Sequence, residues 1–201
     1  MEEETYSLSF TTGALLYHES ITVAELYAEL EDWDAVRQVV ISENRLQMRT
    51  LNASKRIYRE ITSRLKTLTR GQLALLLDLP RQDQCYLLWL AVCKRYRFIY
   101  DFAVEVIREK FLLLDMILTH PDYDRFFNAK AEWHPEMDKI TGRTRYKQRQ
   151  MVFLMLREAD LVTDDFAILP TILSPRLMEA ISQESPADMA VFPTHAIQFE
   201  R

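Results

Sequence analysis

Glycine is nearly absent from this chain, and that scarcity limits the folds open to it. Only Gly13, Gly71 and Gly142 occur among 201 residues, whereas leucine, glutamate, arginine, alanine, glutamine and methionine are abundant along most of the chain. These are good helix formers, while tight turns and phosphate-cradling loops depend on glycine. The sequence therefore predicts a mainly α, compact multi-helix protein with helix-turn-helix or winged-helix-like elements and at most one small β-hairpin.

Capping residues and apolar spacing locate the first helices. A helix that starts at Ser20 or Thr22 and ends near Glu31 is predicted first. Asp32 then caps a second helix over residues 33–44, and Asn52 opens a third. Apolar residues of the third recur every three or four positions, as they do on one buried helical face. They are Ala53, Ile57, Ile61, Leu65 and Leu68.

Residues 81–118 are predicted to form the centre of the core. Apolar side chains there fall on almost every side of any helix drawn through the segment, as in a helix that is buried all round. Pro80 predicts a break before the segment, and the charged residues 94–97 mark a bend within it. The aromatic residues that alternate after the bend are predicted to belong to the core, and not to a stacking platform for single-stranded nucleic acid. They are Tyr96, Phe98, Tyr100 and Phe102.

Three further helices and one hairpin are predicted after residue 118. They are a helix from His120 to about Trp133, one over residues 143–159 after Thr141, a hairpin over residues 161–169 that turns at Asp164 and Asp165, and a helix over residues 175–182. We therefore predict two domains. Residues 1–118 form an N-terminal helical domain with a helix-turn-helix-like part and the central core helices, and residues 119–201 form a C-terminal winged-helix-like domain.

Charge is distributed unevenly along the chain. The net charge is −5, but residues 1–36 hold nine acids and no lysine or arginine, and residues 158–201 hold eight acids and two bases. Residues 37–157 therefore hold 23 bases against 13 acids. A basic middle of this kind indicates a polyanionic partner, and the alternative is an ordinary solvated surface with acidic ends.

The first cationic helix is the third predicted one. Taking Ile57 as the centre of its apolar face and 100° per residue, four cations fall on or beside the opposite face. They are Lys55, Arg56, Arg59 and Lys66. Arg64 falls close to the apolar stripe, so it either extends along an edge to water or pairs with an acid, and we leave it out of this set.

The second cationic helix begins at residue 143. Its first turns carry Arg143, Arg145, Lys147 and Arg149, and no acid occurs from residue 139 to residue 157. Cations at a helix N-terminus oppose the helix dipole, so another interaction must favour them. Arginine pairs with guanine, glutamine with adenine, and lysine reaches phosphates, as in the recognition helix of a helix-turn-helix. The alternative is a solvated amphipathic helix.

Signals for catalysis are weak. The chain contains no Walker loop, GxGxxG, GxSxG or CxxC motif. His120, Asp122 and Asp124 offer metal-ligand types, as does the segment from Glu132 to Glu136, but a helix cap and a proline corner explain these groups more simply. We predict that the protein is not an enzyme, holds no metal or cofactor and has no small-molecule substrate.

The expected cellular location follows from the absence of a membrane-spanning run and of a secretory signal in the sequence. The longest apolar run, residues 85–93, has nine residues, whereas a membrane-spanning helix needs about 20. The N-terminus reads Met-Glu-Glu-Glu and lacks the charged and apolar regions of a secretory signal. We therefore expect a cytoplasmic protein with no membrane segment.

Five stretches distributed over nearly the whole chain resemble the BrxA family of bacteriophage exclusion (BREX) systems. They are residues 6–13 (YSLSFTTG), 32–37 (DWDAVR), 86–93 (YLLWLAVC), 126–135 (FFNAKAEWHP) and 173–176 (LSPR). The resemblance implies an all-helical accessory protein of bacterial antiphage defence that works alongside a DNA methyltransferase, an ATPase and a phosphatase-like component. It also implies binding to double-stranded DNA and a distant likeness to the RNA-binding protein NusB, but it supplies no active-site motif.

These observations lead to one main hypothesis and two alternatives. The main one is a non-catalytic accessory protein of BREX that binds double-stranded DNA through the eight cations named above, with other BREX components as further partners. The alternatives are a protein-protein scaffold within the BREX complex and an RNA-binding protein similar to NusB. The sequence leaves open whether the two cationic helices share one face.

Overall fold

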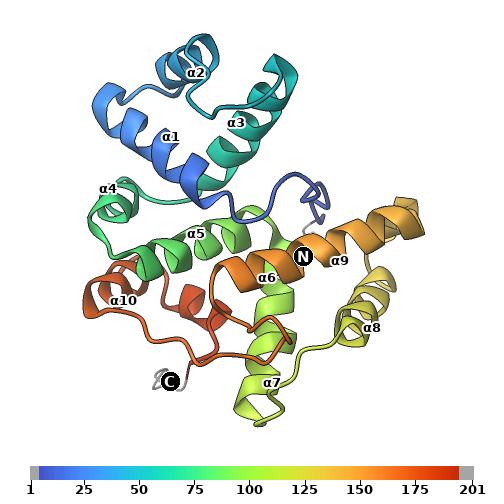
Figure 1. Cartoon of the computed structure of the whole chain (residues 1–201). Helices are drawn as coiled ribbons and strands as arrows, with labels where there is room; N and C mark the ends of the chain where they lie inside the picture. The colour runs from blue at the N-terminus through green and yellow to red at the C-terminus, as the bar shows by residue number, and fades with distance from the viewer. Residues whose placement is uncertain (1–4, 195–201) are drawn as a thin grey trace.

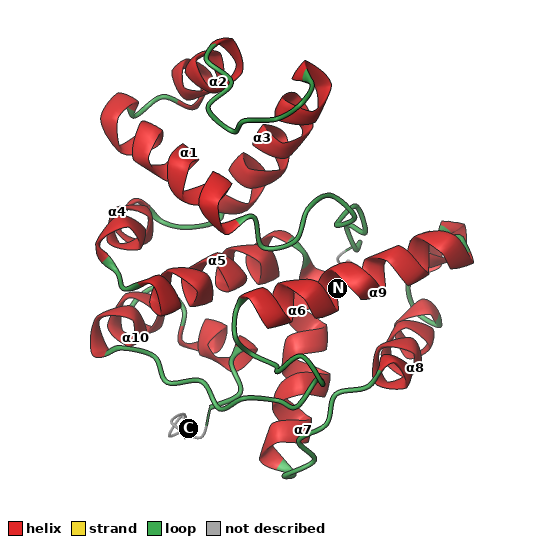
Figure 2. Ribbon diagram, in the orientation of Figure 1, coloured by secondary structure: helices red, strands yellow, loops and turns green. Residues whose placement is uncertain are grey.

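The computed structural model describes residues 5–194, and within that range the chain is helical (Figures 1 and 2). The α-helices are α1 (Tyr17–Leu30), α2 (Trp33–Ser42), α3 (Leu51–Leu65), α4 (Arg70–Asp78), α5 (Arg81–Arg95), α6 (Arg97–Phe102), α7 (Glu109–Leu112), α8 (His120–Ala131), α9 (Gly142–Glu158) and α10 (Pro175–Ser182). A π-helical segment, η1 (Ala103–Arg108), joins α6 to α7, and two 3₁₀ segments are η2 (Pro135–Lys139) and η3 (Pro186–Val191). The mainly α prediction is confirmed.

Helices α1, α2 and α3 pack against one another at the upper end of the molecule in Figure 1. Asp32 caps α2 as predicted, with its carboxylate accepting a hydrogen bond from the Asp34 backbone N–H (2.8 Å). Two predicted starts are wrong. α1 begins three residues before Ser20, because Leu16 adopts a left-handed conformation (φ 58°) that turns the chain without a side-chain cap. α3 is capped by Thr50, so the predicted cap Asn52 lies inside its first turn.

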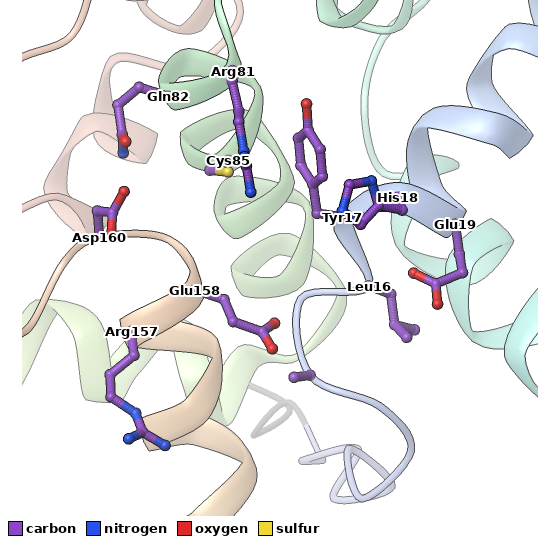
Figure 3. A pocket seen from close by; sticks show the side chains of 11 residues that line it. Leu16, Tyr17, His18, Glu19, Arg81, Gln82, Cys85, Arg157, Glu158 and Asp160 are labelled. Atoms are coloured by element: carbon purple, nitrogen blue, oxygen red, sulfur yellow. The ribbon is translucent and has the colours of Figure 1, made fainter. Parts of the chain in front are cut away.

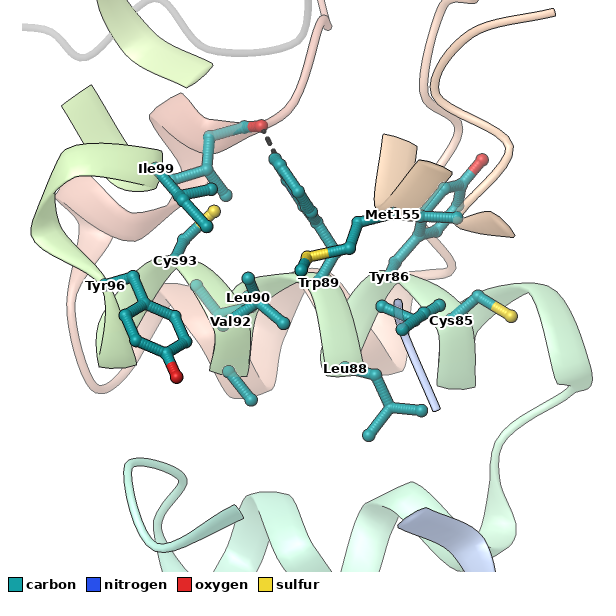
Figure 4. Packing of buried hydrophobic residues seen from close by; sticks show 14 of the residues in the cluster. Cys85, Tyr86, Leu88, Trp89, Leu90, Val92, Cys93, Tyr96, Ile99 and Met155 are labelled. Atoms are coloured by element: carbon teal, nitrogen blue, oxygen red, sulfur yellow. Dashed lines mark hydrogen bonds between the residues drawn. The ribbon is translucent and has the colours of Figure 1, made fainter. Parts of the chain in front are cut away.

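The centre of the molecule is α5, which is buried on nearly all sides as predicted. Figure 4 shows Trp89 of this helix donating its indole N–H to the Val191 carbonyl oxygen (3.2 Å), which ties the C-terminal part of the fold to the core. Pro80 separates α4 from α5, and Tyr96 (φ −124°, ψ 93°) separates α5 from α6, so the predicted break and bend are both confirmed. Of the four alternating aromatic residues only Tyr100 is partly exposed.

Each of the three C-terminal α-helices begins at a threonine or serine whose side chain caps it. Thr119 and Asp122 form a reciprocal capping box at α8, Thr141 caps α9 and Ser174 caps α10. α8 ends at Ala131, short of the predicted end at residue 133. The division at residue 118 stays a prediction, and buried apolar side chains from both sides of it belong to one cluster.

The predicted hairpin is reduced to a turn with single bridges. Val162 pairs antiparallel with Ile168, and the Thr163 N–H donates to the Ala167 carbonyl (2.9 Å), so the chain turns at the two aspartates as predicted. Ala167 pairs in addition with Ile117. Within residues 5–194 these are isolated bridges and no strand forms, so the wing of a winged helix is not confirmed.

The segment that precedes α1 is held by helices from distant parts of the sequence. It crosses the molecule between the α1–α3 group and α9 (Figure 1). Its hydrogen bonds run from the Tyr6 hydroxyl to Asp101 (2.7 Å), from the Gln148 amide to the Leu8 carbonyl (2.7 Å) and from the Leu15 N–H to Glu158 (2.7 Å). In the part of the chain that is described, no helix combines the length and apolar character needed to cross a bilayer.

Candidate nucleic-acid interface

The exposed face of α3 is cationic, because its apolar stripe lies on the other side and only Leu51, at the first position, is an exposed large apolar residue. Ile57, Ile61 and Leu65 are buried against α1, α2 and α5. Lys55, Arg56, Arg59 and Lys66 are all exposed on this helix and the residue that caps its end. The structure therefore places the first predicted set together on one surface.

This surface is the wall of a groove between α2 and α3 with a volume of about 600 Å³. Arg37 of α2 lines the same groove, and one carboxylate, Asp34, lies beside it. We call the five positively charged side chains the groove cations. They are Arg37, Lys55, Arg56, Arg59 and Lys66. None of the ion pairs found among residues 5–194 involves a groove cation. Five cations without a carboxylate partner create a positive potential that a polyanion would relieve.

The groove is lined by aromatic side chains, Trp33 and Tyr58, as well as by cations. The ring of Trp33 stacks on Tyr27 (centroids 3.9 Å apart, 15° between planes), and the Lys66 ammonium lies 5.5 Å from the Trp33 ring centroid. The Tyr58 hydroxyl donates to the Trp33 carbonyl oxygen (2.6 Å). Burial, together with the nearby Asp34 charge, raises the pKa of Tyr58 to about 12, so this hydroxyl keeps its proton at neutral pH. The cations thus lie beside aromatic rings that are themselves packed and hydrogen-bonded between α1, α2 and α3.

Arg37 is not among the cations predicted from the sequence. Arg37 follows Trp33 by four positions, so the two lie on the same face of α2. That spacing could have assigned Arg37 to the groove, but only the packing of α2 against α3 shows that this face meets the cations of α3.

The second predicted set divides into two pairs. Arg143 and Lys147 are exposed at the start of α9. Arg145 and Arg149 instead converge on Asp124 of α8, whose carboxylate lies 3.1 Å from Arg145 Nη2 and forms a short ion pair with Arg149. Arg145 donates further to Asn128 Oδ1 (2.7 Å) and to the Asp124 carbonyl (2.8 Å).

The ion pairs with Asp124 are the interaction that favours Arg145 and Arg149 near the N-terminus of α9. The two arginine side chains are 25% and 17% exposed, and they hold α8 against α9. Gln148, which the recognition-helix hypothesis could use for adenine, is fully buried and donates to the Leu8 carbonyl. On α9, the surface available to a polyanion is therefore Arg143 and Lys147.

Arg64 takes the second of the two roles left open for it. Its side chain is 3% exposed and pairs with Glu60 (2.8 Å). It also donates to the Ala14 carbonyl oxygen (2.7 Å), which ties the segment before α1 to α3. Glu60 accepts a second hydrogen bond from the Tyr96 hydroxyl (2.6 Å), and burial with this bond raises the pKa of Tyr96 to about 12.

A second cavity of about 760 Å³ lies between the starts of α1 and α5 and the end of α9 (Figure 3). Its polar groups serve the fold: Glu158 accepts from the Leu15 N–H, and the Arg81 guanidinium lies 5.2 Å from the Tyr17 ring centroid. Burial raises the pKa of the Cys85 thiol, so this thiol is protonated at neutral pH. The cavity is lined by three carboxylates and two arginines, whereas five cations and one carboxylate line the groove.

The residues considered as metal ligands belong to caps and local contacts. Burial alone would raise the pKa of Asp122, but hydrogen bonds from Thr119 and the charges of Lys110 and Arg125 outweigh it and lower that pKa. His134 stacks on Tyr6 (3.9 Å between centroids). No group of three or more metal-ligating side chains occurs within the described residues.

Fold and surface together define a class: an all-α protein whose amphipathic helices present a cationic groove. The family model of BrxA matches residues 4–185, so the chain belongs to the BrxA family. It is 26% identical over 163 residues to "BREX protein BrxA" of Bacillus cereus (strain H3081.97), covering 79% of this chain and 80% of that protein. It is 25% identical over 150 residues to "BREX protein BrxA" of Escherichia coli O9:H4 (strain HS), covering 75% and 70%.

A similar fold occurs in a solved structure. An uncharacterized protein from Magnetospirillum magneticum superposes with a TM-score of 0.78 over 94% of this chain and 99% of that one, at 20% sequence identity. At this identity the likeness concerns the fold alone.

Proposed function

We propose that this chain is a non-catalytic accessory protein of a BREX antiphage system that binds double-stranded DNA. Membership of the BrxA family and the name of its relatives support the BREX role. One observation carries the DNA-binding role: five groove cations converge on one side of α2 and α3 with no ion-pair partner in the described chain. Lysine and arginine side chains in this arrangement neutralise backbone phosphates.

The groove is the main contact in this proposal, and α9 is the lesser one. Arg143 and Lys147 add two exposed cations, whereas Arg145 and Arg149 are engaged with Asp124 and serve to position α9. Phosphate contacts of this kind fix position on the duplex and carry little sequence information, so modest or no sequence preference is expected.

Binding of a labelled duplex across a salt series tests the proposal. If about six phosphates are neutralised, log K falls against log salt with a slope near −5. The groove variant is Arg56→Glu with Arg59→Glu, and the α9 variant is Arg143→Glu with Lys147→Glu. The matched control is Arg70→Glu with Arg176→Glu, which reverses two charges on side chains that are 81% and 64% exposed outside the groove.

The groove variant is expected to lose most of the affinity, the α9 variant less, and the control little, with folding checked by circular dichroism. A flat salt response, or equal losses in the groove variant and the control, contradicts DNA binding at this site. Tighter binding of an RNA duplex in competition favours the NusB-like alternative. A partner protein that stays bound after nuclease treatment, together with a flat salt response, favours the scaffold.

A further inference from the structure

The groove between α2 and α3 continues along α2. A second hollow, with a volume of about 690 Å³, shares Arg37 and Lys55 with the groove. It adds the uncharged side chains of Gln38, Ile41 and Ser42. Because the groove is lined by the first residue of α2 and the second hollow by its last, the two form one hollow along this helix, which we call the trench.

The trench is long and narrow. Lys55 and Lys66 lie eleven positions apart, which is about 16 Å at the helical rise of 1.5 Å per residue. One strand of DNA carries one charge per 3.4 Å of the helix axis, so this length matches about five phosphates of a strand. Across the trench, the axes of packed helices such as α2 and α3 lie about 8–10 Å apart, which is less than the width of about 12 Å of the DNA major groove alone. A trench of this width admits one sugar–phosphate strand and excludes a whole double helix.

The aromatic rings that line the trench are already covered. Tyr58 is buried, Trp33 stacks on Tyr27, and the Lys66 ammonium lies over the Trp33 ring. A nucleic-acid base that binds by stacking needs an open aromatic face. Neither Trp33 nor Tyr58 provides one, so the trench presents its charges to the backbone of a strand and not a stacking platform to its bases.

The charges of the trench suit phosphate groups. Asp34 is the one carboxylate among its lining residues, so the five groove cations remain in clear excess. Three of them, Arg37, Arg56 and Arg59, carry the forked guanidinium group that matches phosphate oxygens with two parallel hydrogen bonds. A phosphate presents the same charge and oxygens in a paired and in an unpaired strand. A site that contacts only the backbone therefore does not sense whether the bases are paired.

We propose that the trench binds a single sugar–phosphate strand of DNA, and that it accepts this strand whether or not its bases are paired. The inference rests on the proposed function, since the groove cations line the trench. A duplex docks through the backbone of one of its strands, and a single-stranded segment docks in the same way. The ligand of the trench is therefore the phosphodiester strand, and the double helix is one of the forms in which that strand arrives.

Three labelled probes of equal length test the proposal by fluorescence anisotropy: a DNA duplex, a single strand of thymidine nucleotides and an abasic strand that keeps the deoxyribose–phosphate backbone. The full-length protein carries Arg143→Glu with Lys147→Glu, so that α9 adds no cations. Each phosphate contributes about −0.9 to the salt slope for a duplex and about −0.7 for a single strand, so for about five phosphates the thymidine strand should bind within about tenfold of the duplex at 0.1 M salt. The abasic strand should bind as tightly as the thymidine strand.

Adding Arg56→Glu with Arg59→Glu should weaken all three probes at least tenfold, whereas adding the control Arg70→Glu with Arg176→Glu should change them little. The proposal is overturned, while DNA binding at the groove stands, if the groove variant weakens the duplex but the thymidine strand binds more than a hundredfold weaker than the duplex. It is also overturned if the abasic strand binds more than tenfold weaker than the thymidine strand, or if the groove variant leaves single-strand binding unchanged. A flat salt response with every probe would refute the proposed function as well.

Discussion

Neutralising two groove cations gives a quantitative test of how the groove works. The change is Arg56→Gln with Arg59→Gln, which keeps long polar side chains on α3 and removes two charges. Both arginines are exposed and without an ion pair in the described chain, so their loss leaves no buried group unsatisfied. We expect no change in stability beyond about 0.5 kcal/mol, as for surface substitutions generally.

The expected effect on DNA binding follows from counterion release. Each neutralised phosphate contributes about −0.9 to the slope of log K against log salt, so the loss of two makes the slope shallower by about 1.8. At 0.1 M salt the same term lowers affinity by roughly 60-fold, or about 2.5 kcal/mol, and at 0.2 M by roughly 20-fold. The two affinity lines should converge toward 1 M salt.

Fluorescence anisotropy with a labelled duplex of about 20 base pairs, at four or more salt concentrations, measures both slopes. Arg70→Gln with Arg176→Gln serves as the control for a generic change of two charges. Parallel lines for wild type and variant would refute the reasoning, because a constant ratio means that the two arginines act through contacts other than phosphate neutralisation. Identical lines would mean that DNA, if bound, is bound elsewhere.

Three further predictions concern stability and use urea denaturation. Arg64→Ala should lower the free energy of unfolding by about 3–5 kcal/mol, because it leaves the largely buried Glu60 without its cationic partner and with only the Tyr96 hydroxyl to bond. Arg70→Ala, at an exposed pair, should cost less than about 0.5 kcal/mol, and equal losses would contradict the buried role of Arg64. Asp122 has a lowered pKa in the folded protein, so its stabilisation is present above the unfolded value of about 3.9 and disappears as pH falls through the folded one. Asp122→Ala should therefore be less stable than wild type at pH 7 and approach it in acid, and a gap that does not change with pH would refute this. Leu114→Gly should raise the free energy of unfolding by about 0.5–1 kcal/mol through relief of the left-handed backbone, and a decrease would mean that the leucine is needed by the fold.

Local signals in the sequence were sufficient where a cap is made by a short polar side chain. Asp32, Thr141 and Ser174 all cap the helices that were predicted to follow them. The start of α1 has no such signal, because the chain is turned there by Leu16 in a conformation that leucine seldom adopts. For the same reason nothing in the sequence around Leu114 indicates the turn that exposes it.

The candidate site shows a similar division between local and tertiary information. Helical geometry placed the four α3 cations correctly on an exposed surface, because their direction depends only on the apolar stripe of the same helix. The roles of Arg145 and Arg149 depend on Asp124, which lies 21 and 25 residues away on another helix. Residues 139–157 contain no acid, yet in the folded protein a carboxylate from α8 pairs with two of their arginines. This pairing depends on how α8 lies against α9, which the sequence does not show.

The hydrogen bonds of the segment before α1 determine when that segment can reach its final position during synthesis. Its partners Asp101, Gln148 and Glu158 lie 95, 140 and 143 residues further along the chain. A ribosome makes residues 6–15 long before α9 exists, so this segment cannot complete its hydrogen bonds until α9 has been synthesised. Closing such distant contacts is slow, and the segment should be among the last parts of the newborn protein to become protected from proteases.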